Sequence, residues 1–152
     1  MKINFRLPIT LLVMSLWACV QLSGVEQTTE IQELQQKASA GDLESQYQLG
    51  LQYTVKGKWS ADFRRGYDWF FSAAERGHLN AQYMVGMGKL LGRGTETDRK
   101  GAVNFFAMAA KRGHARAQYQ AGDAFLNGAG VEKDQTWGRQ WREQAAWNDH
   151  KY

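Results

Sequence analysis

Three histidines recur at a constant spacing and are the residues that most strongly suggest metal chemistry. His78, His114 and His150 follow one another at intervals of 36 residues. Equivalent positions in stacked helical repeats lie at least one helix spacing apart, roughly 8–10 Å, whereas zinc holds its nitrogen ligands about 2.0–2.1 Å from a single point. We therefore predict no shared metal ion, and interpret each histidine as a polar residue that follows a glycine at a helix end.

The other reactive residue types give little support for catalysis. The single cysteine, Cys19, excludes an internal disulfide and a multi-cysteine zinc site, and no serine lies in a nucleophile-elbow motif. The carboxylates Glu96 and Asp98 recur in the next copy of the spacing, which marks them as parts of a repeated structure. The glycine-rich segments 92–94 and 128–130 follow no predicted strand, so we interpret them as turns and not phosphate loops. We predict no catalytic residue and no cofactor.

The net charge does not favour nucleic acid binding. The chain of 152 residues has a formal charge of +4. Lys2 and Arg6 lie in a segment that we expect to be removed, and without them the formal charge is about +2, which is not the polybasic surface that phosphate backbones attract. We therefore expect no nucleic acid partner.

Residues 1–24 have the layout of a secretory signal peptide. Lys2 and Arg6 form a positive start, residues 7–20 are mostly apolar, and residues 21–24 are small or polar. The apolar run is short for a membrane span. We therefore expect export in preference to an uncleaved anchor helix, with the product in the periplasm, either soluble or anchored at the outer membrane.

Two cleavage sites fit this leader. Residues 16–19 (Leu-Trp-Ala-Cys) resemble a lipobox, in which Cys19 is acylated and becomes the first residue of the mature protein. Trp17 is atypical in that motif. The alternative cut lies near Gly24 and discards Cys19 with the leader. Val20 is not the aspartate that usually retains lipoproteins in the inner membrane, so a lipidated product is expected at the outer membrane.

The rest of the chain is organised as an internal repeat of 36 residues. Segments 40–75, 76–111 and 112–147 align without a gap. Seven columns are identical in all three copies: Gly41/Gly77/Gly113, Gln46/Gln82/Gln118, Tyr47/Tyr83/Tyr119, Gly50/Gly86/Gly122, Asp62/Asp98/Asp134, Ala73/Ala109/Ala145 and Ala74/Ala110/Ala146. This agreement predicts a solenoid of stacked structural units.

Each copy predicts two helices. The first helix of the second copy has the i, i+3, i+4, i+7 spacing of one helical face, at Tyr83, Gly86, Met87 and Leu90. The second helix keeps the same period, with Asp98 at its N-cap and Gly113 just past its end. A glycine inside a helix costs about 1 kcal/mol relative to alanine, so its presence at position 86 and its equivalents predicts the close approach of a neighbouring helix.

The two ends of the repeat array also follow the pattern. Residues 26–39 align with the second helix of a repeat and predict an extra N-terminal capping helix. Arg142 stands where the earlier copies have Phe70 and Phe106, which suits a last helix that no further repeat covers. The predicted fold is all-α: a short right-handed α-solenoid of three helix-turn-helix repeats in the domain 40–152, with seven helices in total.

The third copy resembles the Sel-1-like repeats, relatives of the tetratricopeptide repeats. It contains Ala117-Gln118-Tyr119, then Gly122, the loop 126–131 (Leu-Asn-Gly-Ala-Gly-Val), Asp134 and the pair Ala145-Ala146. The first copy departs from the pattern in its loop, residues 56–59 (Lys-Gly-Lys-Trp). The resemblance implies a non-enzymatic adaptor that holds protein partners, often in the bacterial envelope.

In related solenoids the first helix of each repeat lines the concave face, and the variable positions there carry specificity. In this chain the variable positions are Glu44, Gln48, Gln52, Asn80, Met84, Gly88, Arg116, Gln120 and Asp123. Trp59 and Trp137 are less tied to the repeat and are further candidate anchors. The resulting hypothesis is an exported adaptor or scaffold of the cell envelope. Two alternatives stay open: an immunity-type protein that neutralises a periplasm-targeted toxin, and a structural protein in contact with peptidoglycan.

Overall fold

The structure, a computed structural model, describes residues 30–56 and 60–149. Within these ranges the chain is helical between its turns and contains no strand. Residues 30–39 are helical and are followed by α2 (Leu43–Lys56), α3 (Ser60–Glu75), α4 (Leu79–Leu91), α5 (Arg99–Lys111), α6 (Ala115–Asn127) and α7 (Gln135–Asp149). The all-α prediction of seven helices is confirmed. The leader, Cys19, Trp59 and His150 lie outside the described residues.

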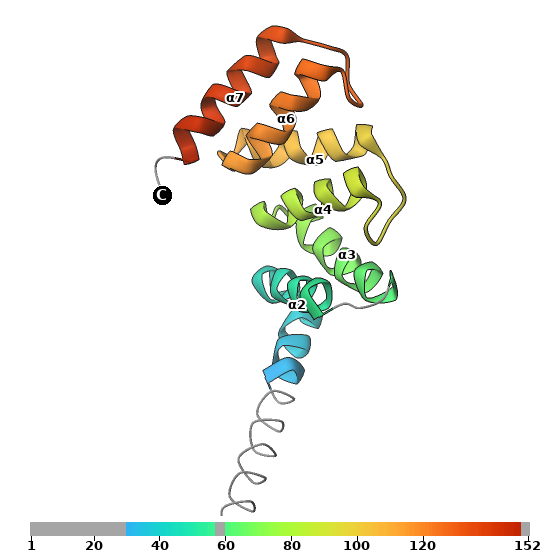
Figure 1. The fold of residues 1–152 in the computed structure, drawn as a ribbon. Helices are drawn as coiled ribbons and strands as arrows, with labels where there is room; N and C mark the ends of the chain where they lie inside the picture. Colours follow the sequence, from blue (N-terminus) through green and yellow to red (C-terminus); the bar gives the residue numbers. More distant parts are fainter. Residues whose placement is uncertain (1–29, 57–59, 150–152) are drawn as a thin grey trace, which may run out of the picture.

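Successive helices pack against one another to form a solenoid. The contacts of α2 with α3, α4 with α5, and α6 with α7 form three helix pairs, and α3 against α4 and α5 against α6 join the pairs. Figure 1 shows the pairs stacked in order, with the helix of residues 30–39 at one end and α7 at the other. Each repeat is therefore held in place by its neighbours.

Repeated glycines let an aromatic ring reach the backbone of the first helix. A Cβ atom added at Gly86 in α4 would lie 2.5 Å from Cε1 of Phe106 in α5, and one added at Gly50 would lie 2.6 Å from Cδ1 of Phe70. Both rings are core residues, 1% and 2% exposed, in surroundings too densely packed for them to move aside cheaply. The close approach predicted at Gly86 is confirmed, and the approaching group is a phenylalanine ring.

The repeated glutamine fastens each first helix to the helix before it. Every side-chain amide donates to the main-chain carbonyl eight residues earlier, at 3.0–3.3 Å, in the pairs Gln46–Ala38, Gln82–Ala74 and Gln118–Ala110. All three glutamines are buried. Because a buried polar group without a partner is costly, these bonds explain why a polar residue occupies a core position in every copy.

The glycine-rich segments are turns, as predicted. Gly92 and Gly128 end α4 and α6 in the left-handed region, with φ of 67° and 69°. Asp98 then caps α5, because its carboxylate accepts a 2.8 Å hydrogen bond from a main-chain amide of the first turn. The first copy differs, since Asp62 lies within the first turn of α3 and not before the helix.

The last helix leaves open the face that a following repeat would cover. Ala74 and Ala110 are 0% and 1% exposed beneath the next repeat, whereas the equivalent Ala146 is exposed on α7. Arg142 takes the place of the core phenylalanine and forms an ion pair with α6. The charge that Arg142 brings to α7 is thus satisfied within the same repeat.

Candidate functional site

Two of the repeated histidines are helix N-caps. Nδ1 of His78 accepts a hydrogen bond from the main-chain amide of Ala81, and His114 accepts one from Ala117, both at 3.1 Å. A ring nitrogen that accepts carries no proton, so the proton of the neutral ring lies on Nε2. The sequence predicted a polar residue after each glycine, and the structure adds its function, which is to begin α4 and α6.

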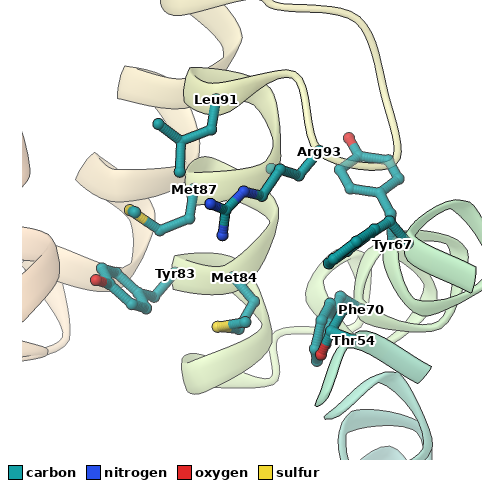
Figure 2. Close-up of a pocket in the computed structure, with 10 residues that line it drawn as sticks. Thr54, Tyr67, Phe70, Tyr83, Met84, Met87, Leu91 and Arg93 are labelled. Carbon is teal, nitrogen blue, oxygen red and sulfur yellow. The ribbon is translucent and has the colours of Figure 1, made fainter. Parts of the chain in front are cut away.

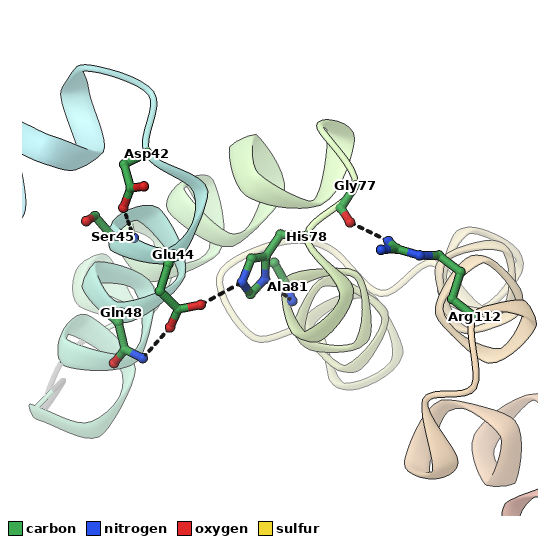
Figure 3. A network of polar contacts seen from close by, with 8 residues as sticks. All are labelled: Asp42, Glu44, Ser45, Gln48, Gly77, His78, Ala81 and Arg112. Carbon is green, nitrogen blue, oxygen red and sulfur yellow. Dashed lines mark hydrogen bonds and ion pairs between the residues drawn. The ribbon is translucent and has the colours of Figure 1, made fainter. Parts of the chain in front are cut away.

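Glu44 on α2 joins the first two repeats through the ring of His78. Figure 3 shows Nε2 of His78 directed at the carboxylate, at 3.0 Å, and the amide of Gln48 donating to the other carboxylate oxygen at 2.7 Å. Both hydrogen bonds lower the pKa of Glu44, with the contribution of Gln48 the larger. Glu44 is therefore an ionised carboxylate with two partners at the surface of the first joint.

An arginine that follows α3 and another that follows α5 complete these joints. The guanidinium of Arg112 donates to the main-chain carbonyl of Gly77, as Figure 3 shows, and Arg76 donates in the same way to Gly41. Both carbonyls belong to glycines with positive φ, 89° and 94°. The turn that begins each repeat is therefore bonded to the turn that begins the next.

The repeated tyrosines stack on these joints. The ring centroids lie 4.8 Å apart in both tyrosine–histidine pairs, Tyr47–His78 and Tyr83–His114. In the third copy the guanidinium of Arg142 lies 4.1 Å from the centroid of the Tyr119 ring, at a distance that gives a cation–π attraction. The three tyrosines consequently form a row along the first helices.

Side chains of the first helices surround two adjoining hollows. One, of about 550 Å³, lies between α2, α4 and the start of α6, and the other, of about 640 Å³, lies between α4, α6 and α7. Tyr83, Ala115, Arg116 and Asp149 line both hollows. We call this continuous surface the central groove. Its size is in the range of ligand-binding sites.

Four of the binding residues predicted from sequence line the central groove: Asn80, Met84, Arg116 and Gln120. Glu44, Gln48 and Gln52 are exposed on α2, outside the lining of the two hollows, and Gly88 is buried. Met84 is half-buried and packs against the core cluster around Phe70, so it contributes to the fold as well as to the groove.

Two other predicted residues lie elsewhere. Asp123 is half-buried and forms an ion pair with Arg142, which fixes α7 against α6. Trp137 is 52% exposed and stacks on Trp141 of the same helix, with ring centroids 6.1 Å apart. The structure therefore places Asp123 in a helix contact and Trp137 on α7, away from the groove.

The sequence reasoning missed the repeated tyrosines as groove residues. Their identity in every copy assigned them to the fold, yet Tyr47, Tyr83 and Tyr119 all line the groove. The available signal was the residue type, because tyrosine combines a large ring with a polar hydroxyl and is enriched at binding hot spots. Tyr119 is 44% exposed and is the most accessible ring of the row.

Charges of both signs border the groove. Arg116 is exposed and forms no ion pair within the described ranges, while Glu143 and Asp149 supply carboxylates from α7. Burial, and secondarily the charge of Arg116, lower the pKa of His114, so that ring is neutral at pH 7. The groove therefore offers rings, amides and separate charges, which are the groups that hydrogen-bond and stack on a polypeptide.

Within residues 30–56 and 60–149, no three His, Cys, Asp or Glu side chains gather closely enough to hold a metal ion. None of the helices described is both long and apolar enough to cross a bilayer.

The repeat unit matches a known family. The Sel1 repeat profile matches residues 43–78, 79–114 and 115–150. The chain belongs to the Sel1 repeat family. The Sel1 frame has the period found in the sequence and begins three residues after the boundaries used above. Sel1 repeat proteins are in general protein-interaction scaffolds and are usually not catalytic.

Solved Sel1 structures share this fold. The crystal structure of a Sel1 repeat protein from Oxalobacter formigenes is 34% identical, covers 76% of this chain and 88% of that chain, and has a TM-score of 0.70. The protective antigen c5321 of uropathogenic Escherichia coli strains, which displays an SLR fold, is 27% identical with a TM-score of 0.70. That match covers 80% of this chain and 29% of c5321. No curated protein matches the chain.

Proposed function

We propose that this Sel1 repeat protein is an exported adaptor that binds an extended segment of a protein partner in the bacterial cell envelope. The observation that carries the proposal is the central groove, in which the tyrosine row lies beside the variable side chains of Asn80, Arg116 and Gln120. The tyrosines that recur in every copy give the groove a regular row of rings, and the side chains that differ between copies give each part of it its own chemistry.

The groove suits a polypeptide better than a small molecule. Its two hollows follow one another across α2, α4, α6 and α7, so an extended segment reaches rings and amides on successive repeats. Amide side chains such as Asn80 and Gln120 supply both donors and acceptors for a peptide backbone, and the guanidinium of Arg116 supplies a charge for an acidic side chain.

The proposal that the protein is exported rests on the leader. Its positive start, its short apolar run and its small polar end are the features of a secretory signal. Cys19 is the proposed lipidation site if the leader is cut before it.

Site-specific photocrosslinking in living cells tests the groove. We would place a photoreactive phenylalanine analogue at Asn80 or Gln120 in the groove, and at the exposed Asn104 of α5 as a matched control. Irradiation should give the same covalent partner at positions 80 and 120 and none at position 104. Mass spectrometry of the adduct identifies the partner and the segment bound.

The identity of the crosslinked species decides between the proposal and its alternatives. A toxin as the sole adduct assigns an immunity function, and muropeptides in place of protein assign contact with the cell wall. Equal adducts at positions 104 and 120 would show that the groove has no special role.

Export is tested by labelling. In cells grown with labelled palmitate, a lipoprotein incorporates the label and Cys19→Ala abolishes it. A mature N-terminus near Val25 would exclude lipidation and retain export, whereas an intact leader on a cytoplasmic protein would refute export.

A further inference from the structure

An apolar hollow lies at the joint between the first two repeats, beside the central groove. It has a volume of about 200 Å³ and is enclosed by residues of α3 and α4 and by the end of α2. Figure 2 shows Tyr67 and Phe70 on one side of it and Met84 and Met87 on the other. None of these side chains belongs to a column that is identical in all three copies, so repeat identity does not account for the hollow.

The size of the hollow matches one large side chain. A closed apolar cavity of about 150 Å³ accommodates a benzene molecule, so a hollow of about 200 Å³ has room for one aromatic or branched side chain. Methionine is unbranched and polarisable, and adapts to the shape of an incoming group. The two methionines therefore make the wall facing the aromatic rings adjustable.

The wall that α4 gives to the hollow becomes polar in the equivalent helix, α6. Counting 36 residues onward, Met84, Met87 and Leu91 correspond to Gln120, Asp123 and Asn127. Asp123 is there bound to Arg142. The apolar wall that faces Tyr67 and Phe70 is consequently a feature of α4 and not of the repeat.

One positively charged side chain lies at the hollow. Arg93, in the turn after α4, lines it, and Figure 2 shows its guanidinium lying across the space between α4 and Tyr67. The side chain is exposed and forms no ion pair within residues 30–56 and 60–149. The hydroxyl of Thr54, another polar group in the lining, already donates to main-chain carbonyls of α2. Arg93 is therefore the group to which an anion would bind.

We propose that this hollow binds the C-terminal residue of the partner, with an aromatic or branched side chain inside it and the terminal carboxylate on Arg93. The guanidinium borders the hollow itself, so the anion must be attached close to the buried group. In a peptide the anion nearest to an apolar side chain is the α-carboxylate of the same residue, which exists only at the chain end. Arginine binds a carboxylate through two parallel hydrogen bonds.

The hollow and the central groove share two lining residues, so one partner can occupy both. Tyr83 and Met84 line the hollow and the groove. The peptide residues that precede the C-terminus would pass over these two side chains toward α6. The inference therefore rests on the proposed function and assigns the partner's C-terminus to the joint between α3 and α4.

Methionine methyl NMR tests the site with a defined probe. The probe is N-acetyl-Ser-Ala-Phe with a free carboxylate, compared with the same peptide as a carboxamide. Met84 and Met87 line the hollow, and Met108, 45% exposed on α5, is an internal control. The acid should shift the signals of Met84 and Met87 in a saturable manner and leave Met108 unchanged, and the carboxamide should bind at least about fivefold more weakly because the charged hydrogen bonds are lost.

Two arginine variants distinguish a specific contact with Arg93 from a general effect of positive charge on peptide binding. Arg93→Gln should remove the difference between acid and carboxamide, whereas Arg139→Gln, an exposed arginine on α7, should preserve it. Equal affinities of the two peptides for the wild type, or equal shifts at Met108, would overturn the proposal. Decanoate that binds the hollow more tightly than the peptide would also overturn it and assign the site to lipid chains. If the peptide does not bind the hollow but crosslinking at positions 80 and 120 persists, the C-terminus proposal is refuted and the groove proposal is retained.

Discussion

Gly86→Ala measures the contact between glycine and phenylalanine on which the helix pairs depend. The added Cβ would lie 2.5 Å from Cε1 of Phe106, and such contacts become ordinary only from 3.4 Å. The ring must therefore retreat by about 0.9 Å, although it is 1% exposed and enclosed by the core.

Two opposing effects set the expected size of the change. Overpacking a core typically costs about 1–3 kcal/mol, and replacing a helical glycine by alanine recovers about 1 kcal/mol of helix propensity. We expect Gly86→Ala to lower the free energy of unfolding by about 1 kcal/mol. In a Phe106→Leu background the clashing ring is gone, so Gly86→Ala should raise stability by about 1 kcal/mol, which gives a coupling energy of about 2 kcal/mol.

Urea denaturation monitored by circular dichroism gives the coupling energy. It is carried out on the wild type, Gly86→Ala, Phe106→Leu and the double variant. Asn104→Ala, an exposed substitution on the same helix as Phe106, is the control and should have the same effect in both backgrounds. A coupling energy within about 0.5 kcal/mol of zero, the usual limit of additivity, would refute the packing account of the glycine column.

Two further predictions concern single polar groups. Burial lowers the pKa of His114 below its ordinary value of 6.5. As the pH falls, the unfolded chain therefore binds a proton at this histidine before the folded chain does. The free energy of unfolding should fall as the pH drops from 7 through 6.5, by at most about 1.4 kcal/mol per pH unit for one proton. His114→Asn keeps an N-cap and should reduce this slope in urea midpoints measured between pH 7 and pH 5; an unchanged slope would contradict the assignment. Ser72 donates to Oε1 of Gln46 at 3.3 Å, whereas the equivalent position in the second repeat is Met108 and Oε1 of Gln82 has no partner among the described residues. Met108→Ser should therefore be more stable than Met108→Ala by about 1 kcal/mol in the same assay, and equal stabilities would show that the hydroxyl does not reach.

The fold could be predicted from the sequence because its determinants are local and occur three times. Gly86 and Ala110 occupy columns that the three copies share, and the structure uses both for close helix packing. The capping function of His114 could not be predicted in this way. Histidine is not among the preferred N-cap residues, so only the geometry of its Nδ1 revealed the bond.

The candidate site was predicted less completely because it depends on distances between repeats. Asn80 and Arg116 were selected as variable positions on the first helices, which line the concave face in related solenoids, and both line the groove. Asp123 is one position off that spacing, and its ion pair with Arg142 depends on how α7 packs on α6. The hollow beside Arg93 depends on the volumes of side chains from three helices, which no pattern within one helix contains.

The serial order of helix contacts has a mechanical consequence. Among α2 to α7, every extensive contact joins helices that are neighbours along the chain, so a force applied between α2 and α7 passes through five helix contacts in turn. When helix contacts are arranged in series, the small tilts between neighbouring helices add up. Their sum changes the width of the central groove by more than any single tilt does. The solenoid is therefore elastic along its axis. A partner bound along the groove would restrain all of these tilts at once and make the solenoid stiffer.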